Sequence, residues 1–254
     1  MMKNTPHDNA SFSLRYLHPY FNNNSFSELS SFSGTYEFET IIPVTSKLYV
    51  NFQLPFVGYS VKSKWDEASE SSIGNIYLGI QSRHFPSDMF TNYISAGIYL
   101  PTASDKKDGV TSLGAFSDYP SLPKYMVNTV SFYGNFTSQL SLSEGAGLAF
   151  DLGPTIMIPT KDQNYRETEA MLHYGIAGSY TYNNLFGSAE VNGVYILTEN
   201  DLDFADRFFN NITLGAGWRG GYVSPSLFYQ WNMEKTLSEM VTGSLGVKLE
   251  VVLP

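Results

Sequence analysis

Cysteine is absent from the 254 residues of this chain. The protein therefore has no disulfide framework, no thiolate metal site and no cysteine nucleophile. Charged residues are also scarce, at 15% of the sequence, whereas soluble domains hold roughly one quarter. No segment contains the ~18 consecutive apolar residues that a membrane-spanning helix requires. The mean hydropathy of -0.16 leaves membrane-spanning strands open, because their alternating pattern averages to near neutral.

Positive charge is the next deficit. The chain has 15 Lys and Arg residues against 24 Asp and Glu residues, a formal net charge of -9. Such an acidic chain disfavours nucleic acid as a partner. The first twelve residues, MMKNTPHDNASF, also lack the apolar segment of a secretory signal peptide. For an exported protein we therefore expect the signal to have been removed.

Alternation of apolar and polar residues runs through the whole sequence. Between Gly74 and Thr102, for example, Leu78 and Ile80 alternate with Tyr77. A period of two indicates strands with one apolar and one polar face, and helical periodicity is hard to find. Twelve strands are predicted, at residues 10–21, 30–43, 48–60, 74–84, 92–103, 126–140, 146–159, 171–182, 185–198, 210–219, 221–233 and 239–252.

The connections between these strands alternate between long and short. The long ones fall near residues 22–29, 61–73, 104–125, 160–170, 199–209 and 234–238. The short ones are residues 44–47, 85–91, 141–145, 183–184 and 219–221. Long loops at one rim and tight turns at the other are typical of bacterial outer-membrane barrels, and a soluble sandwich has no reason to sort its loops in this way.

Charged residues indicate which face of each strand points inward. On the last strand, Val247 and Leu249 alternate with Lys248 and Glu250. A charged side chain is expensive in hydrocarbon but not in a wet lumen, so the polar faces should line a lumen and the apolar faces should meet lipid. The predicted pore-lining residues are Arg15, Glu37, Glu39, Gln53, Tyr77, Gln81, Arg83, Asp151, His173, Glu190, Arg219, Lys248 and Glu250. The predicted outward residues include Leu14, Phe38, Leu54, Ile80, Leu152, Ile176, Val191 and Trp218.

These patterns predict an all-β fold, a transmembrane antiparallel up-and-down β-barrel of about 12 strands. Residues 1–9 are expected to form an N-terminal periplasmic extension. Residues 10–254 are expected to form a single barrel domain in the outer membrane of a Gram-negative-type bacterium. Aromatic residues near strand ends either form interfacial girdles or reflect the preference of strands for aromatics. These residues are Tyr20, Tyr36, Tyr59, Tyr182, Tyr222 and Trp231.

One hairpin, with the strand before it, resembles a known family. The segments LYVNFQLPFVGYS, GNIYLGIQSRHF and SAGIYLPTASDKKDG are similar, over roughly residues 48–105, to outer-membrane transporters named after the meta pathway of phenol degradation. The matching residues are Gly74, Leu78, Gly79, Arg83, Leu100, Pro101 and Thr102. Asn75 stands where the family usually has Asp, and Ala103 where it usually has Gly. The resemblance implies a barrel of about this strand count with a channel role and adds little about the solute.

An outer-membrane lipid hydrolase or acyltransferase is the enzymatic alternative. The chain has four histidines and no G-x-S-x-G motif. His84 lies beside Ser82 near the short-turn end, but no acidic or amide residue is placed convincingly to orient it. His173 falls on the inward face, where a hydrogen-bonded lumen histidine is the simpler interpretation. The sequence thus favours a protein that is not an enzyme.

Clustered carboxylates in one long connection are a weak candidate for Ca²⁺. Asp201, Asp203 and Asp206 are closely spaced, but the segment lacks the glycine turn and the order of an EF-hand loop. A solvated acidic loop explains them better, so no metal site and no cofactor is predicted.

The sequence therefore predicts an outer-membrane channel, or porin-like protein, for the passive passage of small solutes. The expected partners are outer-membrane lipid, lipopolysaccharide and a small solute of unknown identity. The inward charges either pair across a narrow lumen and hold its shape, or set the selectivity of a pore. A third alternative is a non-conducting structural or adhesive barrel, in which residues 104–125 plug the lumen or bind a partner.

Overall fold

The computed structural model describes residues 8–22, 32–62, 67–87, 89–161, 167–198 and 203–254. The strands among them are β1 (Ser11–Phe21), β2 (Gly34–Pro43), β3 (Leu48–Lys62), β4 (Glu67–Ile73), β5 (Tyr77–Ser87), β6 (Phe90–Tyr99), β7 (Thr129–Ser143), β8 (Ala146–Pro159), β9 (Glu169–Tyr182), β10 (Leu185–Ile196), β11 (Phe208–Trp218), β12 (Val223–Asn232) and β13 (Val241–Val252). The helical segments are η2 (Asp105–Lys107), α1 (Asp108–Ser117), η3 (Tyr119–Lys124), η4 (Phe204–Arg207) and α2 (Lys235–Met240).

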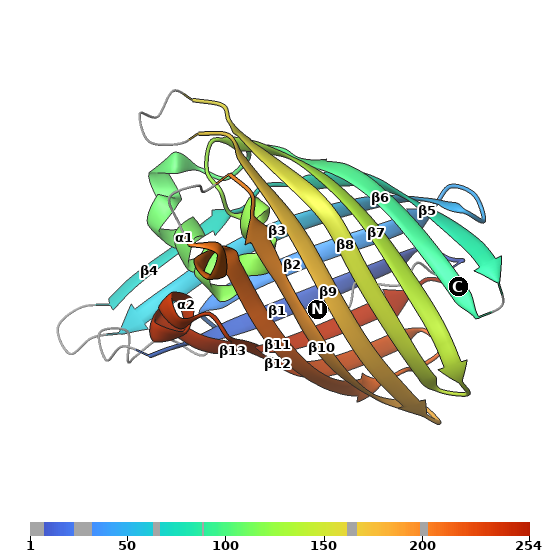
Figure 1. Cartoon of the computed structure of the whole chain (residues 1–254). Helices are drawn as coiled ribbons and strands as arrows, with labels where there is room; N and C mark the ends of the chain where they lie inside the picture. The colour runs from blue at the N-terminus through green and yellow to red at the C-terminus, as the bar shows by residue number, and fades with distance from the viewer. Residues whose placement is uncertain (1–7, 23–31, 63–66, 88, 162–166, 199–202) are drawn as a thin grey trace.

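Twelve of these strands close into an antiparallel barrel (Figure 1). The ring closes because β1 pairs with β2 on one side and with β13 on the other. Neighbouring strands around the ring follow chain order, which is the up-and-down topology that the sequence predicts. The predicted fold class is confirmed. Most of the predicted N-terminal extension, residues 1–9, lies outside the described residues.

The additional strand, β4, lies in a segment that the alternation pattern assigns to a loop. The C-terminal half of β3, residues 56–62, pairs with β4. Its N-terminal half, residues 48–53, pairs with β5. The hairpin of β3 and β4 therefore continues the ladder beyond the barrel rim. Its sequence, EASESSI, has one large apolar residue, Ile73, which is exposed, so backbone pairing with β3 rather than side-chain burial defines this strand.

The two rims differ as the connection lengths predict. Residues 183–184 join β9 to β10 in a two-residue turn, with Asn183 in the left-handed region at φ 53°. Asn is a residue that adopts this conformation readily in hairpin turns. Residues 44–47 join β2 to β3 at the same rim. The opposite rim carries the helical segments and the long connections, and we call it the long-loop rim (Figure 1).

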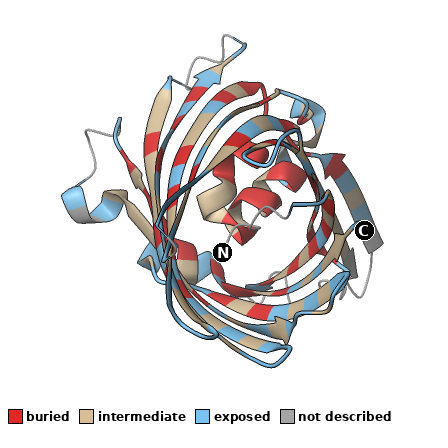
Figure 2. Cartoon of the chain, turned by 90° about the vertical axis from the view of Figure 1, so that its right-hand side faces the viewer, coloured by how far each residue is buried: buried red, intermediate tan, exposed pale blue. Residues whose placement is uncertain are grey.

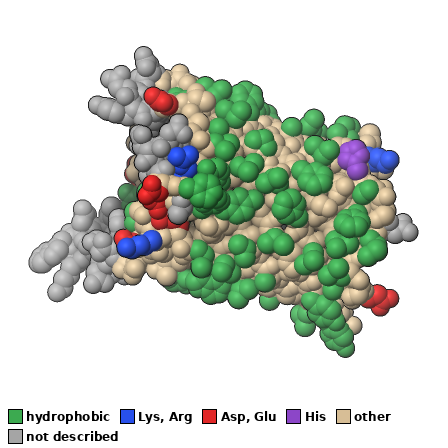
Figure 3. All heavy atoms as spheres, viewed as in Figure 1, with side chains coloured by type: hydrophobic (Ala, Val, Ile, Leu, Met, Phe, Trp, Pro, Cys, Tyr) green, Lys and Arg blue, Asp and Glu red, His purple; other side chains and the backbone are tan. Residues whose placement is uncertain are grey.

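The outer surface of the barrel carries a belt of exposed apolar side chains (Figure 3). Leu14 is 52% exposed, Ile80 56% and Ile176 56%. Soluble monomers rarely expose contiguous apolar surface of this extent, whereas a membrane barrel needs it. Of the eight outward residues that the sequence predicts, only Leu54 is merely half-buried; the other seven are exposed. No helix among the described residues is long and apolar enough to span a bilayer.

Aromatic side chains gather at the long-loop rim of this surface. The Tyr16 ring lies 4.8 Å from the Tyr36 ring, and the Tyr229 ring lies 4.4 Å from the Trp231 ring. The Tyr20 ring lies 6.0 Å from the Tyr229 ring, and His18, 5.3 Å from Tyr20 and 6.4 Å from Tyr16, joins the two pairs. Rings with one apolar and one polar end are suited to the boundary between hydrocarbon and headgroups, so this cluster fits the predicted girdle.

The assignment of faces leads to a first prediction. On β10, Val191 is 44% exposed on the outer surface, whereas Ser188 lines a wide internal cavity. We expect Val191→Arg to reduce the folded, membrane-inserted fraction strongly, because arginine near the bilayer midplane costs about 2–4 kcal/mol. Ser188→Arg on the same strand should be tolerated. Folding into lipid vesicles, followed by gel mobility of the unheated protein, measures both; equal tolerance of the two variants would contradict the assignment.

Candidate functional site

The connection between β6 and β7 folds inside the barrel (Figure 2). Residues 104–125, here called the plug, form η2, α1 and η3 in succession. Connections of this length are uncommon in compact domains, and long ordered connections are often functional. The plug lies in the half of the lumen nearest the long-loop rim and contacts the inner faces of β1, β2, β3 and β13.

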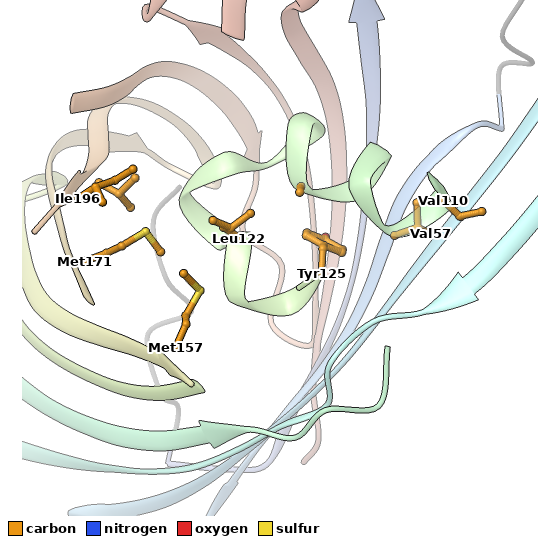
Figure 4. Close-up of a cluster of buried hydrophobic side chains, with 9 residues drawn as sticks. Val57, Val110, Leu122, Tyr125, Met157, Met171 and Ile196 are labelled. Atoms are coloured by element: carbon orange, nitrogen blue, oxygen red, sulfur yellow. The ribbon is translucent and has the colours of Figure 1, made fainter. Parts of the chain in front are cut away.

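Apolar side chains hold the plug against the barrel wall (Figure 4). Val110 and Tyr125 from the plug pack in one buried cluster with Val57 of β3. Leu122 belongs to the same cluster as Met157 of β8, and the remaining wall members are Met171, Val194 and Ile196. Each buried aliphatic or aromatic side chain stabilises this packing by about 1.5–3 kcal/mol. The cluster thus gives the lumen an apolar interior at the place where the plug covers the wall.

A buried ion network ties the plug to β1 and β2. The Arg15 guanidinium donates to Glu37 Oε2 at 3.0 Å and to Asp118 Oδ2 at 2.6 Å. The Lys124 ammonium donates to the same Glu37 carboxylate. All four side chains are at least nine-tenths buried. Asp118 and Lys124 belong to the plug, and Arg15 and Glu37 belong to the wall. The contact of Arg15 with Asp118 and that of Lys124 with Glu37 therefore cross the boundary between plug and wall.

Burial makes this network sensitive to the loss of any member. An ion pair in a low-dielectric interior need not add stability, but removing one partner leaves a buried charge uncompensated, which is strongly destabilising. Burial alone would raise the pKa of Asp118, but Arg15 and Lys124 outweigh it and hold the pKa below its ordinary value. Asp118 is therefore ionised at neutral pH.

The residues at the base of the plug are clamped by Asn75, which is fully buried. Its Nδ2 donates to the Pro123 carbonyl at 2.9 Å and to the Met126 carbonyl at 2.7 Å. Its Oδ1 accepts from the Ala103 backbone N–H at 3.0 Å. One side chain thus fixes both the entry and the exit of the plug. Without these three hydrogen bonds, the backbone groups that they satisfy would be buried without a partner.

The residues around Asn75 complete this clamp. Thr102 donates its hydroxyl to the Gly74 carbonyl at 2.7 Å and accepts from the Ile76 N–H at 3.0 Å. A Cβ on Gly74 would overlap the Lys124 carbonyl oxygen. The family resemblance rests on the same residues, Gly74 and Thr102 among them. The motif therefore has a local structural role: it docks the plug onto the start of β5.

Beneath the plug lies a polar cavity of about 190 Å³, here called the inner cavity. Ten of the thirteen predicted pore-lining residues line it: Arg15, Glu37, Glu39, Gln53, Tyr77, Gln81, Asp151, His173, Glu190 and Lys248. They come from strands on all sides of the ring. The structure therefore brings most of the predicted set around one cavity.

Three carboxylates of the inner cavity are supported by amide or hydroxyl side chains. Glu39 Oε1 accepts from Asn51 at 3.0 Å and from Gln53 at 2.9 Å. Glu190 Oε1 accepts from Asn192 at 2.6 Å. Asp151 likewise accepts from Asn135 and Thr137. These hydrogen bonds fix the positions of the three carboxylates on the wall.

His173 of β9 stacks on Tyr133 of β7. Its ring lies 4.7 Å from the Tyr133 ring at an interplanar angle of 9°, and its Nε2 is 2.8 Å from Asn135 Oδ1. A Cβ on Gly153, on the intervening strand β8, would collide with the imidazole. Glycine at this position allows the ring to lie across the strand. A hydrogen-bonded lumen histidine is the prediction made from the sequence.

A wider cavity of about 790 Å³ lies toward the short-turn rim. Arg219 and Glu250 line it, and Lys248 borders both cavities. Arg83 lines neither of these two cavities. Its guanidinium donates to Asp8 at 2.6 Å and to the Ser46 carbonyl at 2.8 Å at the short-turn rim. The lumen thus widens from the plug toward the short-turn rim.

Asp118, Lys124 and Asn75 are functional-site residues that the sequence reasoning missed. Asp118 and Lys124 fall in a long connection without strand periodicity, where charged residues are expected to be exposed to solvent. In the sequence, Asn75 stands out only as a departure from the family pattern. The available signal was the length of residues 104–125 together with their apolar content, which is unusual for a solvated loop.

The candidates for other chemistry lie outside the lumen. His84 Nε2 is 3.0 Å from Ser82 Oγ, and both side chains share the outer face of β5 near the short-turn rim. Within the described part of the chain, no carboxylate is hydrogen-bonded to His84. Asp203, just before η4, and Asp206, within it, are exposed, and Asp201 lies outside the described residues.

Comparison with known proteins gives similarity in structure only. No protein-family model matches the chain, and no curated protein matches its sequence. An outer membrane channel from Pseudomonas putida F1 superposes with a TM-score of 0.68 at 12% identity, covering 98% of this chain and 97% of that one. The KdgM porin superposes with a TM-score of 0.58 at 6% identity, covering 96% and 99%.

A third solved structure, LpxR from Salmonella typhimurium, superposes with a TM-score of 0.51 at 8% identity, covering 96% of this chain and 100% of that one. Identities this low establish a shared fold and nothing finer. The full-length coverage shows that the whole barrel, rather than one hairpin, is shared. The chain thus has the fold found in outer-membrane channels and porins.

Proposed function

We propose that this protein is an outer-membrane channel for small solutes, closed at rest by residues 104–125. The observation that carries the proposal is the combination of an apolar outer belt with a polar lumen that contains two cavities. A structural barrel needs no hydrated interior. Side chains that fill the lumen completely would serve it better, because buried polar groups without partners are costly.

Because the plug blocks part of the lumen, the proposed channel is a gated one. The plug blocks the long-loop half of the lumen and is attached by side-chain contacts rather than by strands of the ring. Contacts of this kind can break without disturbing the ladder that closes the barrel. A non-conducting barrel is the second candidate, and the buried ion network favours it, because the network holds the lumen shut.

The enzymatic alternative has less support. The pair formed by Ser82 and His84 lies on the outer face and has no carboxylate partner among the described residues. A hydrolytic triad needs an oriented base as well as a nucleophile. Solved structures that share this fold at a TM-score above 0.5 include an outer membrane channel and the KdgM and NanC porins.

We further propose that the short-turn rim faces the periplasm and the long-loop rim faces the exterior, following the general layout of such barrels. In this orientation the plug lies at the external entrance, and solutes enter the inner cavity only when it moves. Outer-membrane lipid would surround the apolar belt, and lipopolysaccharide would contact the acidic long-loop rim.

Conductance across planar bilayers tests the function. At neutral pH we expect rare, brief openings. Asp118 has a depressed pKa, so its pairing with Arg15 is intact above the ordinary aspartate value of about 3.9 and is lost as pH falls through the lower value. Lys124, Glu37 and Arg15 face it in the same network. Openings should therefore stay rare from pH 8 to about 5 and become frequent only in strong acid. A reconstituted barrel that never conducts at any pH would refute the channel.

A further inference from the structure

The charges around the inner cavity do not balance. Its lining holds five carboxylates, on Glu37, Glu39, Asp118, Asp151 and Glu190, against three cationic groups, on Arg15, Lys124 and Lys248. The ion network of the plug pairs Arg15 and Lys124 with Glu37 and Asp118. Counted over the whole lining, the described residues thus carry two more carboxylates than Lys and Arg groups.

The amide side chains beside two of these carboxylates share one orientation. Asn51 and Gln53 each direct their N–H toward Glu39, and Asn192 directs its N–H toward Glu190. The carbonyl oxygens of all three amides have no hydrogen-bond partner, although they are buried. A buried acceptor without a partner is unfavourable unless a ligand or water satisfies it. Asn192 is 8% exposed and lines the cavity.

These two groups lie on opposite sides of the lumen. Asn51 and Gln53 are on β3, and Asn192 is on β10, six strands away in a ring of twelve. Each wall therefore presents a carboxylate together with amide carbonyl oxygens. Such a surface offers hydrogen-bond acceptors and negative charge, and it lacks the cluster of guanidinium groups that would recognise an anionic sugar or a phosphate.

We propose that the inner cavity is a binding site for a small organic cation with a protonated amine. An ammonium group carries a positive charge and three N–H donors and no acceptor, which matches the carboxylates and amide carbonyl oxygens of these two walls. Glu39 on one wall and Glu190 on the other supply negative charge, and the carbonyl oxygens of Asn51, Gln53 and Asn192 are further acceptors for N–H groups of the cation. This inference rests on the proposed channel function, because the bound cation would be the class of solute that the channel carries.

Binding of ethylammonium to the purified full-length protein in detergent, followed by calorimetry, tests the site without requiring conduction. We expect saturable binding of ethylammonium and none of acetate. Glu39→Gln and Glu190→Gln should each weaken binding by about tenfold, because a hydrogen bond to a charged group is replaced by a neutral one. Asp206→Asn, which removes an exposed carboxylate outside the cavity, is the matched control and should bind as the wild type does.

Bilayer currents separate failure of the site from failure of the channel. A conducting protein should prefer K⁺ to Cl⁻, and ethylammonium should reduce its K⁺ current; both effects should diminish in the Glu39→Gln, Glu190→Gln double variant. Binding without any conduction would support the site and refute the channel. Conduction without ethylammonium binding, or binding unchanged in the double variant while that variant remains folded by gel mobility, would overturn the site.

Discussion

Asp118→Asn should increase the time that the channel spends open by about tenfold or more. The substitution removes the charge that Arg15 contacts at 2.6 Å across the boundary between plug and wall. A hydrogen bond between charged groups contributes about 1.5–3 kcal/mol, and each 1.4 kcal/mol changes an equilibrium by about tenfold. Single-channel recording in planar bilayers measures the open fraction directly.

The matched control is Asp105→Asn in the same plug. Asp105 accepts from Lys161 at 2.6 Å, but both side chains are roughly half exposed. Exposed ion pairs contribute about 0–1 kcal/mol and are screened by salt. We therefore expect Asp105→Asn to change the open fraction by less than about threefold. If both variants open equally, the buried network is not what holds the plug.

Asn75→Ala should weaken both the plug and the barrel. The substitution leaves the carbonyl groups of Pro123 and Met126 and the N–H of Ala103 without their side-chain partner in a fully buried position. Each buried group left unsatisfied costs about 1–3 kcal/mol. We expect a lower denaturant midpoint for unfolding from detergent and frequent channel openings in the fraction that folds.

Asn75→Asp provides a sharper version of this experiment. Aspartate has nearly the same shape, and it keeps the acceptor for the Ala103 N–H. An ionised carboxylate has no N–H to donate, so it would repel the Pro123 and Met126 carbonyl oxygens. We expect this variant to open the plug at least as much as the alanine variant does. Wild-type behaviour of Asn75→Asp would show that the two carbonyl contacts do not hold the plug.

The wall of the barrel was predictable because its signal is local. Each strand alternates between lipid and lumen, so neighbouring residues such as Val247 and Lys248 already differ in the sequence. The alternation of long and short connections then predicts an up-and-down strand order without any knowledge of contacts. The inward placement of Glu39, Asp151 and Glu190 follows from the same alternation, and they do line the inner cavity.

The plug could not be predicted in the same way. Its position depends on contacts between residues more than eighty positions apart, such as Arg15 with Asp118 and Glu37 with Lys124. No local pattern separates a charged loop residue that pairs inside a lumen from one that is solvated. The strand β4 was missed for a related reason, because it pairs only with β3 beyond the rim and buries no regular apolar face.

The absence of cysteine permits one decisive measurement on the plug. Ser244 Oγ donates to the Ser117 carbonyl at 3.1 Å, so these two buried residues place the wall strand β13 beside the end of α1. In a variant with Ser117→Cys, Ser244→Cys and Asp118→Asn, a short reducible thiol cross-linker joins plug and wall. We predict frequent openings before cross-linking, none after it, and recovery on reduction. Currents that are the same in the cross-linked and reduced protein would contradict the claim that residues 104–125 close this channel.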